Sequence, residues 1–192
     1  GWGGQLEEAL VDRLVECADG DPAGVDFVQV GNTDYRVGME RGDFDFVWVY
    51  DGWDKLRLEQ AGVDVTTIPF VDHLDCIPDW YTPLLATSQE LIDTDPDLVR
   101  AFVGVTSRGY DAAVADPGAA ATALLDAAPE LDADLVRASA EYLAGRFTAD
   151  ADRWGAQDAA VWDRFVGFLA DVGLLDEAPA DISAWYTDEF LP

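Results

Sequence analysis

The sequence has very little positive charge. Of its 192 residues, 11 are Lys or Arg and 39 are Asp or Glu, so the formal net charge is -28, and Lys55 is the single lysine. No basic stripe exists to neutralise phosphates, which excludes nucleic acid as a partner. The acidic residues are spread through all the predicted helices. Dispersed acid with almost no lysine is typical of adaptation to high salt, where dense counterions screen the repulsion.

Histidine and cysteine are also scarce, and so are long apolar runs. His73 is the only histidine, and Cys17 and Cys76 are the only cysteines, without CxxC spacing. This excludes a metal site built from several His or Cys ligands. The two cysteines are compatible with free core thiols and with one disulfide alike. No run approaches the roughly 20 apolar residues of a membrane span.

The first part of the chain alternates between strand-like and helix-like patterns. Strands are predicted at 25–30, within the stretch 43–53, and at 63–68, with helices at 34–41 and 53–61 between them. This order predicts βαβ units and a mostly parallel sheet, and therefore an α/β fold.

The second half reads as mostly helical, after a short strand at 84–87. Asp95-Pro96 and Asp116-Pro117 each pair an N-cap aspartate with proline at the first helical position. Further helices are predicted at 132–143 and 156–172. The aromatic residues of the last helix recur at helical spacing, which predicts core packing.

The central strand is followed by a cluster suited to a ligand. Trp48, Tyr50, Asp51 and Trp53 lie at or near its carboxyl end, where open α/β sheets bind ligands. Flat rings beside a carboxylate suit a flat, hydrogen-bonding heterocycle. For Trp48 alone, plain core packing is an equal alternative. Asn32, just beyond the preceding strand, is a candidate ligand contact or a helix cap.

Several segments together resemble one known family. They are Gly1-Trp2-Gly3-Gly4 with Glu7-Glu8, residues 28–34 and 40–42, Trp48-Val49-Tyr50-Asp51-Gly52-Trp53, Tyr81-Thr82-Pro83, and residues 95–100, 153–157 and 188–192. In this order they are similar to the thiamine-pyrimidine-precursor group of solute-binding proteins, which is related to fungal thiamine-pyrimidine synthases. The resemblance covers essentially the whole chain.

This resemblance implies a periplasmic-binding-protein-like (type II) α/β fold with two lobes that close on a ligand. The chain is then expected to be a fragment that begins inside the second lobe and lacks the first part of lobe one. Residues 1–75 would form lobe two, 76–87 a crossing or hinge segment, and 88–192 a helical part completing the lobes.

The resemblance also implies a function. Its members deliver a small aminopyrimidine to the permease of an ABC importer, without catalysis, cofactor or metal. They work on the extracellular side of the membrane, and an upstream lipid anchor would be the only membrane attachment. The positions implicated in ligand binding are Trp2, Glu7, Asn32, Trp48, Tyr50, Trp53 and Tyr81. Glu7 is equally well placed as a helix-start residue, and Tyr81 as a hinge support.

Two alternatives remain open. The synthase branch of the resemblance uses a lysine-bound pyridoxal phosphate, a sacrificial histidine and a cysteine-rich iron site. Lys55 and His73 are the only candidates here, on unrelated elements, and Cys17 and Cys76 form no cluster. An enzyme is therefore disfavoured. The other alternative keeps the transport role but changes the ligand to riboflavin or another aromatic solute, which needs a larger pocket.

Overall fold

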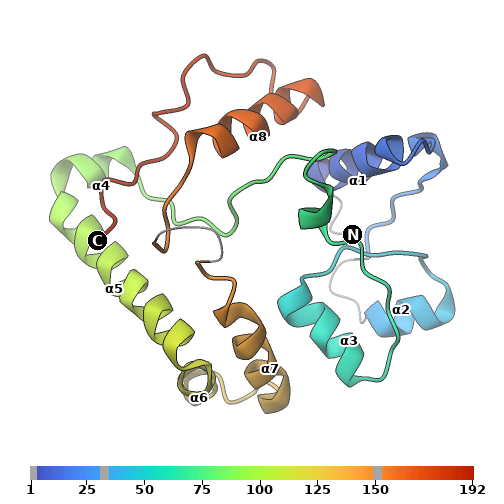
Figure 1. Cartoon of the computed structure of the whole chain (residues 1–192), viewed down its shortest axis with the longest axis horizontal. Coiled ribbons are helices and arrows are strands. Elements are labelled where there is room, and N and C mark those ends of the chain that lie inside the picture. The colour runs from blue at the N-terminus through green and yellow to red at the C-terminus, as the bar shows by residue number, and fades with distance from the viewer. Residues whose placement is uncertain (1–3, 31–34, 149–152) are drawn as a thin grey trace. The chain divides into compact units, whose positions relative to one another are not determined.

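The computed structural model describes residues 4–30, 35–148 and 153–192, and everything said below of the structure concerns these residues. Their regular structure is helical (Figure 1). They divide into two compact units, each assembled from several stretches of chain. Unit 1 comprises residues 1–48, 63–81 and 158–184, and unit 2 comprises residues 49–62, 82–157 and 185–192. The predicted division into 1–75, 76–87 and 88–192 stays a prediction.

Unit 1 is organised around helix α1 (Gln5–Cys17). Leu6, Leu10 and Leu14 recur at a spacing of four residues and form its apolar stripe. Leu10 is fully buried and meets Ile77 and Phe168, which are 1% and 7% exposed. Complete removal of such aliphatic side chains from water stabilises the unit by about 1.5–3 kcal/mol each.

The other helical elements of unit 1 are short, except for α8 (Ala159–Asp171). Helix α2 (Tyr35–Arg41) ends at Gly42, and α8 is followed by Gly173; both glycines have positive φ values, of 69° and 74°. Only glycine adopts this conformation without strain, so both ends predicted from the sequence are confirmed. The unit also contains the 3₁₀ turns η1 (Pro22–Gly24) and η3 (Phe70–His73).

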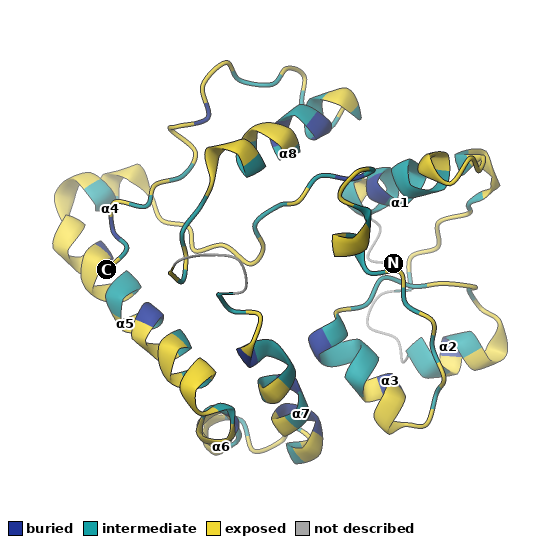
Figure 2. Cartoon of the chain, viewed as in Figure 1, coloured by how far each residue is buried: buried dark blue, intermediate teal, exposed yellow. Residues whose placement is uncertain are grey.

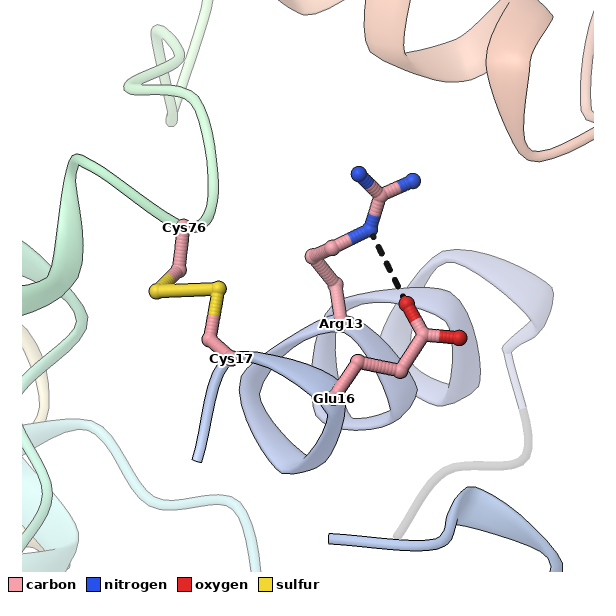
Figure 3. The surroundings of a disulfide bond; sticks show 4 residues. All are labelled: Arg13, Glu16, Cys17 and Cys76. Carbon is pink, nitrogen blue, oxygen red and sulfur yellow. Dashed lines mark ion pairs between the residues drawn. A yellow bond between two sulfur atoms is a disulfide. The ribbon is translucent and has the colours of Figure 1, made fainter. Parts of the chain in front are cut away.

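A disulfide joins Cys17, at the end of α1, to Cys76, so the question that the sequence left open is answered (Figure 3). The two Cα atoms lie 6.0 Å apart, and the residues are 59 positions apart in sequence. On α1 itself, Arg13 pairs with Glu16 at 3.5 Å. The disulfide therefore fixes the C-terminal end of α1 to the segment that supplies Ile77 to the core.

Unit 2 contains most of the helical residues. Its long helices start at aspartate caps: the side chains of Asp95, Asp116 and Asp132 accept backbone N–H bonds of 3.1, 2.9 and 2.9 Å from the first turn. Such caps contribute about 1 kcal/mol each. The elements are the π-helical turn η2 (Asp51–Lys55), α3 (Leu56–Gln60), α4 (Gln89–Thr94), α5 (Pro96–Ala115), α6 (Pro117–Ala127) and α7 (Ala133–Ala144).

Helix α7 carries the most buried face of unit 2, whereas α5 is largely exposed (Figure 2). Val136 on α7 is 1% exposed. On α5, Leu98, Phe102 and Val105 do share a face, but they are 53%, 59% and 59% exposed. Tyr110, nearer the C-terminal end of α5, packs against Phe147 and Trp154.

The predicted α/β class and the type II two-lobed fold are wrong for the described residues. None of the segments 25–30, 43–50, 63–68 and 84–87 is a strand in the structure. Apolar side chains within them lie in water: Val28, Phe46 and Ile68 are 51%, 56% and 67% exposed. A strand is stable only when its N–H and C=O groups pair with a neighbour. The β-favouring pattern specifies side chains that suit a sheet, but it does not supply that neighbour.

Candidate functional site

The sequence-predicted aromatic turn lies in unit 2 and is wound as the π-helical turn η2. The carbonyl of Tyr50 accepts N–H bonds from Trp53 and Asp54, at 2.9 and 2.8 Å. In return, the carboxylate of Asp54 accepts the N–H of Tyr50 at 3.0 Å. These bonds fix the turn at both ends. Single π-helical turns are frequent at functional sites.

This turn leaves one ring exposed and one covered. Tyr50 is 62% exposed, which is unusual for a large aromatic side chain in a folded unit. Trp53 is partly buried and lines a pocket of unit 2. Gly52, between them, is buried, and a Cβ added to it would lie 2.8 Å from Leu143. A larger residue at this position would therefore force the Leu143 side chain to shift where η2 approaches α7.

A carboxylate and a phenol join η2 to α7. Tyr142 donates a hydrogen bond of 3.3 Å to Asp51 Oδ2. The Arg146 guanidinium lies 3.6 Å from the centre of the Tyr142 ring and also donates to the Tyr142 carbonyl at 2.6 Å. Burial raises the pKa of the Tyr142 phenol above 10.0, and the negative charge of Asp51 raises it further. The phenol is thus held protonated as a donor.

Sequence reasoning singled out Asp51 but missed Tyr142 and Arg146. Tyr142 lies in the last turn of α7, and Arg146 follows the helix, directly after its C-cap residue Gly145. Nothing local connects them with Asp51, because 91 residues separate Asp51 from Tyr142. The short separation of Tyr142 and Arg146 in sequence could have predicted their contact, but not the contact with Asp51.

Trp48 belongs to unit 1, where it packs among aromatic residues. Its ring lies edge-on to Phe70, with centroids 4.8 Å apart, and is 6.5 Å from Trp80. Trp80 in turn stacks on Phe165 at 5.9 Å. Trp48, Phe70 and Trp80 also pack against Leu10 and its buried neighbours. This geometry matches the core alternative that the sequence left open for Trp48.

Tyr81 supports the start of α8. Its hydroxyl accepts a hydrogen bond of 2.6 Å from the backbone N–H of Asp158, the N-cap residue of that helix. Its ring lies 6.0 Å from that of Trp162. The hydroxyl satisfies one N–H at the helix start, so this residue has a structural task within unit 1.

The remaining predicted site residues are placed as follows. Glu7 lies in the first turn of α1 and is partly buried. Trp2 and Asn32 lie outside the described residues. The structure therefore brings Tyr50 and Trp53 onto one turn of unit 2, whereas Glu7, Trp48 and Tyr81 belong to unit 1.

The candidate residues of the enzyme alternative also occupy different units. Lys55 lies in unit 2 and pairs with Glu59 at 3.6 Å, one helical turn along. His73 lies in η3 of unit 1. Within the described ranges, no group of three or more His, Cys, Asp or Glu side chains could hold a metal ion. In the same ranges, no helix combines the length and the apolar character needed to cross a bilayer.

Comparison with known proteins places these observations in a family. The chain is similar to the riboflavin-binding protein RibY of Chloroflexus aurantiacus, with 29% identity over 180 residues. The alignment covers 88% of this chain and 48% of RibY, so the chain spans about half the length of this curated relative. The NMT1/THI5-like family matches residues 1–120. Since this match covers more than half of the sequence, the chain belongs to the NMT1/THI5-like family.

Proposed function

We propose that this chain is part of a solute-binding protein that captures a flat, uncharged nitrogen heterocycle for an importer, with riboflavin as the first candidate ligand. The observation that carries the proposal is the exposed Tyr50 ring on a fixed turn beside the Asp51 carboxylate. An exposed ring held by hydrogen bonds of its own backbone can stack on a flat ligand at little entropic cost.

The comparisons support this choice of ligand class. A relative with 29% identity carries the name of a riboflavin-binding protein. The ring system of riboflavin is flat and contains a pyrimidine-type edge with several hydrogen-bonding atoms. A ligand of this kind needs aromatic area for stacking and a few polar groups for orientation.

A small aminopyrimidine is the second candidate. The segments Trp48-Val49-Tyr50-Asp51-Gly52-Trp53 and Tyr81-Thr82-Pro83, which resemble the thiamine-precursor group, favour it. It shares the flat pyrimidine edge with riboflavin but offers less area for stacking. Of the proposed contacts, Tyr50 and Trp53 stand out, because they lie on one turn of unit 2. Trp2, Glu7, Asn32, Trp48 and Tyr81 stay in the proposal with less support.

Charge favours a neutral ligand. With a formal net charge of -28, the protein repels anions over long range at low salt. Riboflavin should therefore bind more tightly than its phosphorylated form, and the difference should shrink as salt screens the field.

The setting of the protein follows from the same proposal. A solute-binding protein works outside the cytoplasm, delivers its ligand to a membrane permease, and in many organisms carries a lipid anchor. The Cys17–Cys76 disulfide supports this setting, because disulfides persist in oxidising compartments. The proposed role involves binding without chemistry, and the pairing of Lys55 with Glu59 supports no catalytic task for the lysine.

Calorimetric titration in molar KCl tests the proposal with three ligands: riboflavin, riboflavin 5′-phosphate and 4-amino-5-hydroxymethyl-2-methylpyrimidine. Riboflavin is expected to bind, and Tyr50→Ala to weaken it about tenfold through the lost stacking. Phe46→Ala is the matched control, because Phe46 is similarly exposed, at 56%, and lies outside the proposed set. Absence of binding by all three ligands, or equal effects of the two variants, would contradict the proposal.

A further inference from the structure

Unit 2 contains an apolar pocket at the junction of η2, α5, α6 and α7. Its volume is about 170 Å³. Small side chains from the three helices create the space, and two aromatic rings border it. The lining residues are Trp53, Ala113, Ala120, Ala121, Leu124, Val136, Ser139, Ala140, Leu143 and Phe147.

Among the described lining residues, Ser139 is the one that carries a hydroxyl. Its side chain belongs to the buried face of α7 and is 6% exposed, and its hydroxyl takes part in no hydrogen bond within the described residues. Serine in a helix commonly bonds the carbonyl one turn back, as Thr94, Thr106 and Thr122 do elsewhere in unit 2. This hydroxyl is not among the fully buried side-chain atoms that lack a partner in the described residues, so its oxygen keeps some accessible surface. A ligand in the pocket could form a hydrogen bond with it.

The remaining lining sets the chemistry of such a ligand. None of the described residues that line the pocket is charged. A charged or strongly polar molecule would lose its hydration there and gain at most one hydrogen bond. An apolar ring would gain contact with Trp53 and Phe147 and would leave water.

The volume of the pocket further limits the class of ligand that it can bind. An engineered protein cavity of about 150 Å³ lined by apolar side chains binds benzene, so a volume of about 170 Å³ admits one such ring. Sites for larger ligands measure about 300–1,000 Å³. The tricyclic ring of riboflavin is therefore too large. An aminopyrimidine is small enough, but several of its polar atoms would be left without partners.

We infer that this pocket binds a single uncharged aromatic ring that carries at most one hydrogen-bonding group, of which phenol is the simplest example. The pocket shares Trp53 with the proposed capture of a heterocycle, but it excludes riboflavin by size, so the inference concerns a different ligand and is tested separately. The ring would lie among the alanines of α6 and α7, and its hydroxyl would bond Ser139.

Phenol and benzene are the probes for the test, with calorimetric titration and thermal unfolding as readouts in molar KCl. Both compounds are expected to bind and to raise the melting temperature, because a ligand of the native state stabilises it. Ser139→Ala is expected to weaken the affinity for phenol about 3- to 10-fold, which corresponds to the loss of one hydrogen bond. The affinity for benzene is expected to change by less than about twofold. Equal effects on the two probes, or no binding of either, would overturn the inference.

A space-filling variant checks the location. Ala120→Leu places an isobutyl group in the pocket and is expected to abolish binding of both probes. Ala123→Leu makes the same change at an exposed position of α6 and is expected to bind normally. Unchanged binding by a folded Ala120→Leu variant would overturn the inference. Should that variant fail to fold, the comparison of the two probes in Ser139→Ala decides the question alone.

Discussion

Tyr142 on α7 donates a hydrogen bond of 3.3 Å to Asp51 in the π-helical turn η2, across 91 residues of sequence. Within unit 2, the bond joins helix α7 to the turn that carries Tyr50 and Trp53. Arg146 covers the outer face of the phenol ring at 3.6 Å. The turn proposed to bind the ligand is therefore held by the Tyr142 phenol, which can lose its proton at high pH.

The first prediction concerns alkaline pH. Burial and the charge of Asp51 place the pKa of Tyr142 in the folded chain above its unfolded value of about 10. The folded state then binds the proton more tightly, so this stabilisation is complete below pH 10 and is lost as the pH rises through the folded pKa. Urea unfolding measured between about pH 9 and 11 should show the free energy of unfolding falling in the wild type and falling less in Tyr142→Phe.

The same variant tests the hydrogen bond at neutral pH. Tyr142→Phe should lower the free energy of unfolding by about 0.5–1.5 kcal/mol, because Asp51 loses its donor. Tyr110→Phe is a suitable control, since the ring of Tyr110 packs on Phe147 and Trp154 in the same unit. A pH profile that is identical in Tyr142→Phe and in the wild type would refute the first prediction.

The second prediction concerns the close approach of η2 to α7. A Cβ on Gly52 would lie 2.8 Å from Leu143 Cδ2, 3.1 Å from Leu143 Cγ and 3.3 Å from Tyr142 Cδ1. Gly52→Ala should therefore cost about 1–3 kcal/mol of stability through overpacking. In contrast, Gly109 lies within α5 with nothing inside 4 Å of an added Cβ.

Gly109→Ala is the matched control for Gly52→Ala. It should stabilise the chain by about 0.5–1 kcal/mol, because alanine loses less backbone entropy in a helix. Guanidinium unfolding of the two variants measures both effects. Changes of the same sign and size would mean that η2 does not lie against α7 as described.

Local chemistry explains why the predicted helices are present in the structure and the predicted sheet is not. Asp95 and Asp116 cap their helices through bonds to residues three positions along, so the signal and its consequence are adjacent in sequence. A strand depends on a partner segment elsewhere in the chain. The apolar residues at 25–30 and 63–68 carry no information about such a partner. Neither segment is a strand in the described structure, and Val28 and Ile68 are 51% and 67% exposed.

The candidate-site residues show the same contrast between features set by sequence neighbours and features set by long-range packing. The sequence predicts Tyr50 and Trp53 as neighbours, and a short turn keeps them together in the structure, although their role in binding stays a prediction. Trp48, two residues before Tyr50, faces the core of unit 1, and only its contacts with Phe70 and Trp80 reveal this. Asp51 gains Tyr142 as a partner through packing over 91 residues, which no local pattern encodes.

The third prediction concerns the disulfide. Cross-linking residues that are 59 positions apart restricts the unfolded chain, and the chain-entropy relation gives about 4 kcal/mol at 25 °C for a loop of this length. The double variant Cys17→Ala, Cys76→Ala should lose roughly this free energy of unfolding. Urea unfolding measures it.

A reductant provides the control for the disulfide. Reducing the wild type should lower its unfolding midpoint toward that of the double variant, and the reductant should leave the double variant unchanged. Equal midpoints for the oxidised wild type and the double variant would mean that the cross-link contributes nothing in solution.

The fourth prediction concerns salt. The acidic side chains, which give the chain a net charge of -28, repel one another in the folded state, and KCl should weaken this repulsion. Each kcal/mol relieved raises the melting temperature of a chain of this size by about 2–4 °C. Because the Debye length falls to about 3 Å at 1 M, most of the rise should occur below that concentration.

A charge variant separates screening from general salt effects. Asp111, Asp126 and Asp163 are exposed on α5, α6 and α8, and changing all three to Asn removes three of the 39 acidic charges. If repulsion is the cause, the triple variant melts higher than the wild type at low salt and gains less from KCl. Salts that strengthen apolar burial would instead raise both proteins equally and continue to do so above 1 M. Parallel curves for the two proteins would therefore assign the salt dependence to burial and reject the electrostatic explanation.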